Sequence, residues 1–217
     1  MSATFEQWVQ AAFDHPSEEP EWYWDTTFDS VWQSLGLSNM LTVRYLTRLF
    51  LETHRLKQYS LAQVAKGIWF LIGDASPAQP TYALLRPEVA FGERAACIQA
   101  MTIFFHDFVA PAAPGLYEIE SDPFHIACYM WWDIFPTWGG PQAGEPGLQT
   151  TCLKVMADVL DLPSELCRLS ALHGLNHWHL HYAEQVARVV DAFLDKQGNV
   201  TPRIREYASR ARHGLCQ

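Results

Sequence analysis

The chain has 217 residues, of which 49% are hydrophobic and 18% are charged. This composition excludes the polar, highly charged class of disordered proteins, and the length allows a core to form without disulfide or metal cross-links. The formal net charge of −9 excludes nucleic acid as an expected partner, because binding to phosphates requires a basic surface.

Apolar residues recur at spacings of three and four along most of the chain, and alternating runs typical of β-strands are missing. The sequence therefore predicts an all-α fold in a single domain spanning residues 1–217. The predicted helices, in chain order, are Phe5–Asp14, Phe28–Leu35, Asn39–Glu52, Leu61–Asp74, Glu93–Val109, Pro123–Phe135, Gly147–Leu160, Ser164–Leu180, Glu184–Lys196 and Pro202–Arg212.

Several predicted helix starts carry a side chain that can accept a hydrogen bond from the first turn. These N-cap residues are Ser38, Ser60, Thr201 and either Ser121 or Asp122. Three long connections, residues 75–92, 110–123 and 136–147, are rich in proline or glycine and are expected to form loops.

From residue 93 onward, the predicted helices follow one another as antiparallel pairs: 93–109 with 123–135, 147–160 with 164–180, and 184–196 with 202–212. The stretch "SALHGLNHWHLHYAEQVARVVDAFLDK", a leucine-rich helix followed by an amphipathic one, resembles HEAT or armadillo-like repeats. The resemblance covers the C-terminal half and implies a right-handed α-α superhelix of stacked hairpins that serves as a protein-binding scaffold. An irregular helical bundle is the alternative fold.

The aromatic segment "SDPFHIACYMWWDIFPTWGG", residues 121–140, reads as a central helix with one narrow polar stripe. Winding it as a continuous helix puts Tyr129, Trp132 and Asp133 on the same side as His125. A carboxylate in that setting needs a partner, and no Lys or Arg is near in sequence. We expect a histidine of another helix, His173 or His177, or an arginine to fill this role.

The stretch "SALHGLNHWHLHY", residues 170–182, holds four histidines. On a helix, His173, His177 and His181 fall along one line beside the apolar stripe, whereas His179 points elsewhere. His173 and His181 are about 12 Å apart along the axis, so the three cannot share one metal ion. The zinc-protease pattern is excluded because Gly174 stands where that pattern requires its glutamate.

Two roles remain open for these histidines. The favoured one is structural: the imidazoles form hydrogen bonds between helices, Asn176 bonds to a neighbouring backbone, and Gly174 lets another backbone approach. This interpretation predicts no metal and no cofactor. The alternative is an enzyme or metal-binding pocket built from His125, Asp133, His173 and His177.

The cysteines and the N-terminus bear on the cellular compartment. The five cysteines are far apart and form no C-x-x-C pair, which indicates reduced, structural thiols. The start "MSATFEQWVQ" has neither a basic beginning nor an apolar run, and no later segment reads as an uncharged membrane-spanning stretch. We therefore expect a cytoplasmic protein without a membrane partner.

The charge is unevenly distributed along the chain. Residues 1–30 hold seven acidic residues and no Lys or Arg, and six more acidic residues lie between Arg94 and Lys154 with no base among them. This pattern favours a basic protein partner, because opposite fields steer association, although a negative charge that only maintains solubility is an alternative.

Together these patterns favour a non-enzymatic helical-repeat protein that binds another macromolecule, such as an immunity- or antitoxin-like protein masking a basic partner. A purely structural subunit of an assembly is a further possibility. The expected binding surface combines exposed tryptophans with the histidine stripe. Its predicted residues are Trp22, Trp24, His125, Tyr129, Trp132, Asp133, Trp138, His173, His177 and His181.

Overall fold

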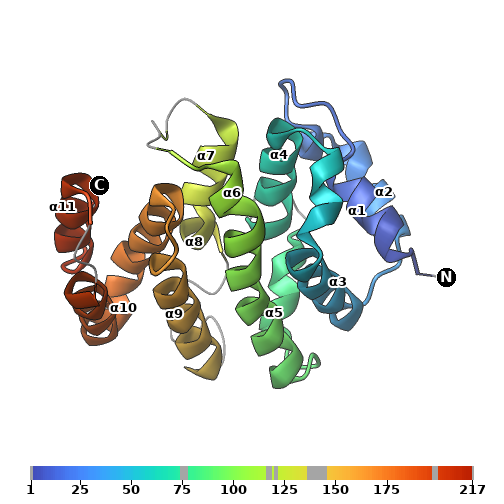
Figure 1. Cartoon of the computed structure of the whole chain (residues 1–217). Coiled ribbons are helices and arrows are strands. Elements are labelled where there is room, and N and C mark those ends of the chain that lie inside the picture. Colours follow the sequence, from blue (N-terminus) through green and yellow to red (C-terminus); the bar gives the residue numbers. More distant parts are fainter. Residues whose placement is uncertain are drawn as a thin grey trace.

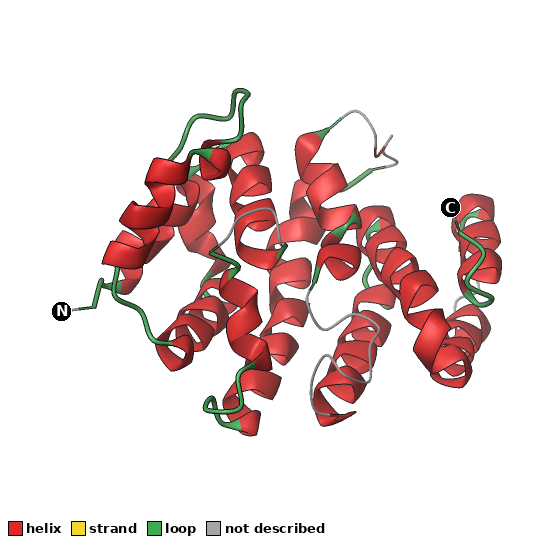
Figure 2. Cartoon of the chain, turned by 180° about the vertical axis from the view of Figure 1, so that it is seen from behind, coloured by secondary structure: helices red, strands yellow, loops and turns green. Residues whose placement is uncertain are grey.

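A computed structural model describes residues 2–73, 78–115, 119, 122–135, 146–196 and 200–216. The described residues form helices joined by turns and contain no strand, which confirms the all-α prediction (Figure 2). The helices are α1 (Phe5–Phe13), α2 (Thr26–Ser34), α3 (Asn39–Leu51), α4 (Leu61–Ile72), α5 (Phe91–Phe104), α6 (Ala110–Ala112), α7 (Pro123–Tyr129), α8 (Trp131–Ile134), α9 (Pro146–Leu160), α10 (Glu165–Lys196) and α11 (Pro202–Ala211).

Shorter helical turns connect some of these helices. Trp22–Trp24 (η1), Thr53–Gln58 (η2) and Pro80–Leu85 (η3) are 3-10 turns, and Phe105–Val109 (η4) is a π-type turn between α5 and α6. The turn η3 lies inside the connection 75–92, which the sequence pattern predicted to be a loop. Its missed helical turn begins at Pro80, a residue whose fixed φ suits a first turn.

The helices pack in two rows that run along the molecule, from the N-terminus at one end to α11 at the other (Figure 1). In one row α5 packs between α3 and α9, and in the other α7 packs between α4 and α10. The predicted pairing of 93–109 with 123–135 is therefore wrong as a main contact, because α5 packs mainly on α3 and α9 whereas α7 packs mainly on α4 and α10. The other two predicted pairs are confirmed, since α10 packs against both α9 and α11.

The predicted helices differ from the observed ones at two places that matter for the site. The predicted helix 123–135 is interrupted at Met130, whose ψ of −4° ends α7 before α8 begins. The predicted helices 164–180 and 184–196 are the two arms of α10, which bends where Tyr182 leaves helical geometry with φ −132° and ψ 37°. The predicted break thus lies where α10 bends.

The predicted N-caps are confirmed where the structure describes them. Ser38, Ser60, Asp122 and Thr201 each accept a hydrogen bond from a backbone N–H of the helix that follows. At Ser60 the bond is reciprocal, because the side chain of Gln63 accepts from the Ser60 backbone N–H at 3.0 Å. These caps fix the starts of α3, α4, α7 and α11.

The buried apolar side chains form one cluster that extends along both rows. Four of the five cysteines are buried and all five are free thiols, as expected for structural cysteines. Burial raises the pKa of the Cys97 thiol to about 12 and that of Cys167 to about 11. These buried thiols stay protonated and unreactive at neutral pH.

The helical run Phe91–Ala112 is, among the described residues, the one stretch long and apolar enough to cross a membrane by length and composition. This run contains Glu93, Arg94 and Asp107, so the sequence expectation, which concerned an uncharged stretch, stays a prediction. Core helices of soluble proteins meet the same criterion, and α5, which begins this run, packs between α3 and α9.

Candidate functional site

The helices α7 and α8 both pack on one face of α10, and two small residues of α10 set how closely they approach. The Ser170 hydroxyl donates a hydrogen bond to the Cys128 carbonyl at 2.6 Å, which fixes the end of α7. One turn later, a Cβ at Gly174 would lie 2.3 Å from the Cβ of Trp132, so only glycine lets α8 approach this closely. The predicted close approach at Gly174 is thus observed, but a side chain makes it rather than a backbone.

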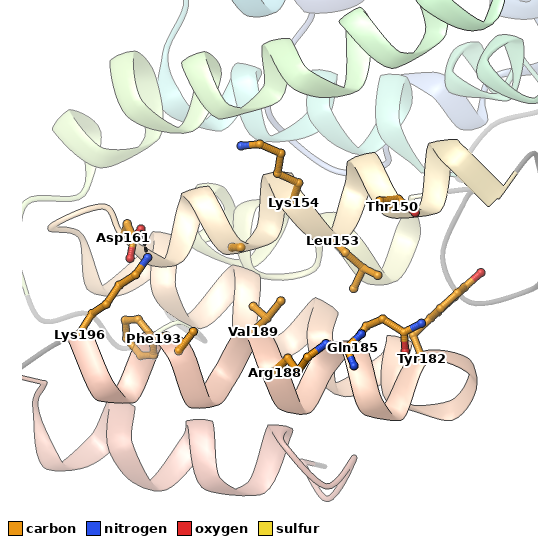
Figure 3. Close-up of a pocket in the computed structure, with 12 residues that line it drawn as sticks. Thr150, Leu153, Lys154, Asp161, Tyr182, Gln185, Arg188, Val189, Phe193 and Lys196 are labelled. Carbon is orange, nitrogen blue, oxygen red and sulfur yellow. Dashed lines mark hydrogen bonds and ion pairs between the residues drawn. The ribbon is translucent and has the colours of Figure 1, made fainter.

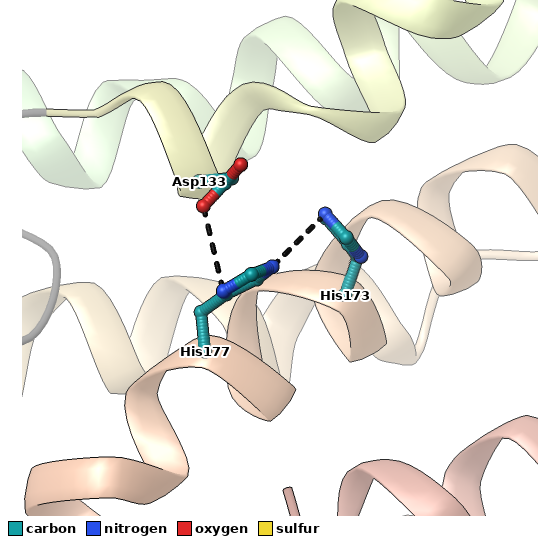
Figure 4. Close-up of side chains that lie close together, drawn as sticks. All are labelled: Asp133, His173 and His177. Atoms are coloured by element: carbon teal, nitrogen blue, oxygen red, sulfur yellow. Dashed lines mark hydrogen bonds and ion pairs between the residues drawn. The ribbon is translucent and has the colours of Figure 1, made fainter. Parts of the chain in front are cut away.

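This close packing places Asp133, the residue after Trp132, beside the histidines of α10 (Figure 4). The Asp133 carboxylate lies 3.5 Å from Nδ1 of His177, and Nε2 of His177 lies 3.3 Å from Nε2 of His173. Ligand atoms of the three side chains all lie within 4.8 Å of one another. The two predicted segments, 121–140 and 170–182, therefore form one site.

Two tyrosines extend the polar contacts beyond His173. The Tyr207 hydroxyl of α11 lies 3.1 Å from Nδ1 of His173 and 2.5 Å from the hydroxyl of Tyr129. The Tyr129 ring also stacks on the His173 ring, with centroids 4.1 Å apart. We call these five residues, Asp133, His177, His173, Tyr207 and Tyr129, the histidine network.

Burial controls the protonation of the inner part of the network. Desolvation, with a smaller effect of the neighbouring His177, lowers the pKa of His173 to about 4. Burial also raises the pKa of Tyr129, and burial together with Tyr129 raises that of Tyr207 well above its usual value. At neutral pH, His173 is therefore a neutral imidazole between two protonated tyrosines and His177.

One arrangement of protons satisfies every contact in the network. Tyr207 donates to Nδ1 of His173, the Nε2–H of His173 donates to Nε2 of His177, and the Nδ1–H of His177 faces the Asp133 carboxylate at 3.5 Å. The outer end is open to solvent, because the side chains of His177 and Asp133 are 33% and 26% exposed. Such a chain can pass a proton between solvent and a buried tyrosine, or hold a cation between its two imidazoles.

Some predicted site residues lie in this network and others do not. Asp133, His173, His177 and Tyr129 come together as described. His125 is buried on α7 and is outside the group of possible ligands, and His181 is exposed close to the bend of α10. The four-residue pocket proposed from the sequence therefore reduces to three of its members.

The four tryptophans of the predicted binding surface differ in their exposure. Trp132 was expected on the binding surface but is fully buried, because the break at Met130 turns α8 so that this indole packs under Gly174. Trp22 is partly buried and stacks on His15, with ring centroids 3.8 Å apart. Trp24 is 62% exposed, as a surface role requires. Trp138 lies outside the described residues.

Tyr207 is the member of the network that the sequence pattern did not indicate. It lies on a helix with strongly segregated polar and apolar faces, and nothing in its local sequence marks it as a partner of residues 78 and 34 positions away. The predicted backbone contact of Asn176 is confirmed: its amide donates to the Cys216 carbonyl at 3.2 Å and accepts from the Cys216 N–H at 2.8 Å. This pair holds the C-terminal residues on α10.

A groove between α9 and the second arm of α10 was also missed (Figure 3). It has a volume of about 410 Å³, and its lining includes Leu153, Val189 and Phe193. The charged side chains at its edge are paired, Lys196 with Asp161 at 3.3 Å for example, so the groove is an apolar surface without a dominant charge. The amphipathic pattern of residues 184–196 predicts one apolar face that packs in the core. It does not indicate that some apolar side chains remain exposed in a groove.

No family model, no curated protein and no solved structure matches this chain.

Proposed function

We propose that this protein is a non-enzymatic helical-repeat scaffold that binds a basic protein partner. The binding site is the exposed part of the segment 18–25, which we call the Trp24 surface. It consists of the exposed side chains Glu18, Glu19, Trp24 and Asp25.

The packing of the helices supports a scaffold of the HEAT-like kind. In one row α5 packs on α3 and α9, in the other α7 packs on α4 and α10, and α9 and α10 join the two rows by packing on each other. Stacks of this type bury a shared core and leave long faces for partners. We therefore propose a superhelix of stacked hairpins in preference to an irregular bundle.

The exposed indole of Trp24 is the observation on which the binding proposal depends. It is 62% exposed on the short turn Trp22–Trp24, in a protein that buries most of its large aromatic side chains. Tryptophan supplies more binding energy at protein interfaces than almost any other residue when a partner covers it. An indole left in water at this position is therefore suited to insert into a partner.

The charge around Trp24 selects the kind of partner. Glu18, Glu19 and Asp25 are exposed. Lys66 beside them is largely buried, with its ammonium group on the Glu18 carbonyl and the carboxylates of Glu19 and Glu21. A surface of this sign attracts a basic protein and repels nucleic acid. A protein that masks a basic partner, as immunity proteins and antitoxins do, is one form of this function.

The test is affinity capture from a native extract of the source cells with immobilised wild-type protein and with Trp24→Ala. We expect the wild type to retain one basic protein in stoichiometric amount at low salt, and Trp24→Ala to lose it. With that partner purified, Trp24→Ala is expected to weaken binding by at least about 2 kcal/mol, as hot-spot truncations do. Glu18→Gln with Glu19→Gln is expected to slow association and to reduce its salt dependence.

The groove between α9 and α10 supplies the matched control. Val189→Glu places a charge in that groove and leaves the Trp24 surface intact, so binding should be unchanged. If Val189→Glu abolishes capture while Trp24→Ala does not, the partner occupies the groove and the proposed surface is wrong. A partner that is acidic would contradict the charge argument.

A further inference from the structure

We propose that His173 and His177 bind one divalent late transition-metal ion, of which Zn²⁺ is the reference, between their Nε2 atoms. In this site Asp133 and Tyr207 are the hydrogen-bond partners of the two Nδ1 atoms. The proposal is independent of the protein-binding function and concerns a different face of the molecule.

The spacing of the two ring nitrogens fits a metal ion directly. His173 and His177 are four residues apart on α10, so both rings leave the same face of one helix turn. Their Nε2 atoms are 3.3 Å apart. Two nitrogens bound to a tetrahedral zinc at about 2.0–2.1 Å are themselves separated by about 3.3–3.4 Å. The rings therefore stand at the ligand separation without any movement of the helix.

The contacts of the other two ring nitrogens support the same assignment. Metal-binding histidines almost always donate their second N–H to a carboxylate, a backbone carbonyl or a water molecule, which fixes the ring and directs the free nitrogen at the ion. Here Nδ1 of His177 faces the Asp133 carboxylate at 3.5 Å, and Nδ1 of His173 faces the Tyr207 hydroxyl at 3.1 Å. When a metal ion replaces the Nε2 proton of His173, that ring carries its proton on Nδ1 and donates it to the Tyr207 hydroxyl, so both Nε2 lone pairs are available to the ion.

Two lone pairs directed at each other over 3.3 Å repel unless a cation lies between them. A proton on one Nε2 satisfies this need, and so does a metal ion that accepts both lone pairs. The Asp133 oxygen lies within 4.8 Å of the ligand nitrogens, so the site also holds a negative charge to offset the ion. This carboxylate favours a divalent ion over the neutral, proton-bridged pair.

The site is open on the side that an ion must enter. The side chains of His177 and Asp133 are about a third and a quarter exposed, whereas His173 is 8% exposed. Two protein ligands leave the remaining positions of a tetrahedral ion to water or to a donor from another molecule. Imidazole nitrogen selects zinc, nickel or copper, and not calcium or magnesium, whose ligands are oxygens.

The test is calorimetric titration of metal-free protein, purified without a histidine tag, with zinc chloride and separately with nickel sulfate. We expect one saturable site per chain for each metal. His177→Ala and His173→Ala should each weaken binding by more than about 100-fold, which exceeds the loss expected when an outer partner is removed. Asp133→Asn should weaken it by about 10- to 100-fold with one site retained.

The exposed His181 gives the matched control, since it lies on the same helix but outside the group. His181→Ala should keep the zinc affinity within about twofold, because separate sites act independently. Circular dichroism of each variant checks that the helices remain folded, and His177→Gln replaces His177→Ala if that variant unfolds. X-ray absorption of the zinc complex should give two imidazole nitrogens in the first coordination sphere.

Three results would overturn the proposal. The first is wild-type protein that binds zinc no better than the His173→Ala, His177→Ala double variant. The second is a loss in His181→Ala as large as in His177→Ala, which would show non-specific binding by surface histidines. The third is an unchanged affinity in Asp133→Asn, which would remove Asp133 from the site.

Discussion

The two ends of the molecule use the same residue types, histidine and aromatic side chains, in different ways. At the N-terminal end His15 stacks flat on Trp22, with an angle of 13° between the rings, and its Nε2 bonds to the Ala11 carbonyl at 2.9 Å. In the histidine network the two imidazoles instead face each other through their nitrogens. The ring of His15 serves as apolar surface, whereas those of His173 and His177 present polar atoms.

The difference shows what separates a packing histidine from a chemical one. His15 has a backbone carbonyl one helix turn away, so its polar atom is satisfied locally and needs no distant partner. His173 and His177 contact each other, and their Nδ1 atoms face residues of α11 and α8 that are far away in sequence. A network that depends on three elements responds as a unit when any of them moves.

The largest expected effect on stability comes from replacing two glycines, one near each end of the molecule, that lie directly against a large aromatic side chain. Gly174→Ala would place a methyl group 2.3 Å from the Trp132 Cβ, and Gly67→Ala would place one 2.3 Å from the Phe13 ring. Both changes should lower the free energy of unfolding by about 3 kcal/mol or more, because neither neighbour can move aside cheaply. Urea denaturation measures this loss.

Gly92→Ala is the control, since nothing lies within 4 Å of the added methyl group. It should leave stability unchanged or raise it by about 0.5–1 kcal/mol. The two glycine variants should differ at the histidine network, because only Gly174→Ala should also disturb the contact of Asp133 with His177. Equal zinc binding in Gly174→Ala and Gly67→Ala would break the link between this packing and the network.

The second effect is a pH dependence of stability in the metal-free protein. The pKa of His173 is lowered from 6.5 to about 4 by burial and by His177, so the unfolded state binds the proton more tightly. The stabilisation is fully present above pH 6.5 and is lost as the pH falls toward 4, by about 3 kcal/mol over that interval. Asp133, Tyr129 and Tyr207 are the other titratable groups that face this pair.

Unfolding curves recorded between pH 4 and 7 with a chelator present measure this slope. His173→Gln should remove most of it while leaving the stability at lower pH nearly unchanged. A wild-type protein with constant stability between pH 4.5 and 6.5 would show that His173 is not buried as a neutral ring.

Glu52 gives the counterpart near the N-terminal end. Hydrogen bonds from Arg48 and then Arg55 lower the pKa of this carboxylate to about 2. Its stabilisation is present above pH 4.5 and is lost as the pH falls toward 2, and the partial exposure of the ion pairs limits it to less than about 1 kcal/mol. Glu52→Gln should therefore change how the free energy of unfolding depends on pH below pH 4.5. It should leave the pH dependence caused by His173 at higher pH unchanged.

The sequence predicted the helices better than the site because helix signals are local. The caps at Ser38, Ser60 and Thr201 and the apolar spacing give most helix bounds to within two residues. The position of Trp132 failed because a continuous helix was assumed, whereas the turn at Met130 changes which face that residue joins. No local pattern reports such a turn when the residues around it are all apolar.

Four of the five residues of the network were predicted from the sequence, and the central three follow from one argument. An acidic residue in an apolar segment without a nearby base needs a distant partner, and this argument predicts His173, His177 or an arginine of another helix as the partner of Asp133. Tyr207 has no such unmet need in its own helix, so only the packing of α11 on α10 reveals it. Buried charge is visible in a sequence, whereas a neutral partner is not.

A third effect concerns how the C-terminal residues are held on α10. Asn176→Ala removes two hydrogen bonds to the Cys216 backbone and should cost about 1–2 kcal/mol, because Asn176 is buried. Asn39→Ala, which removes an exposed contact with Glu88, should cost less than about 0.5 kcal/mol. Hydrogen exchange of the Cys216 amide should rise in the first variant alone, and equal exchange in both would contradict the anchoring role.

The smallest expected effect is that of Trp24→Ala on stability, and it bears on the function of the N-terminal end. Trp24 is 62% exposed, so its loss should change the free energy of unfolding by less than about 0.5 kcal/mol. Trp22→Ala should cost far more, because that indole packs on His15, Phe28 and Phe70. Thermal and urea unfolding of the two variants give the comparison. A Trp24→Ala variant as unstable as Trp22→Ala would mean that both indoles contribute to the core. A Trp24→Ala variant that is stable but no longer binds its partner would show that Trp24 serves binding whereas Trp22 serves folding.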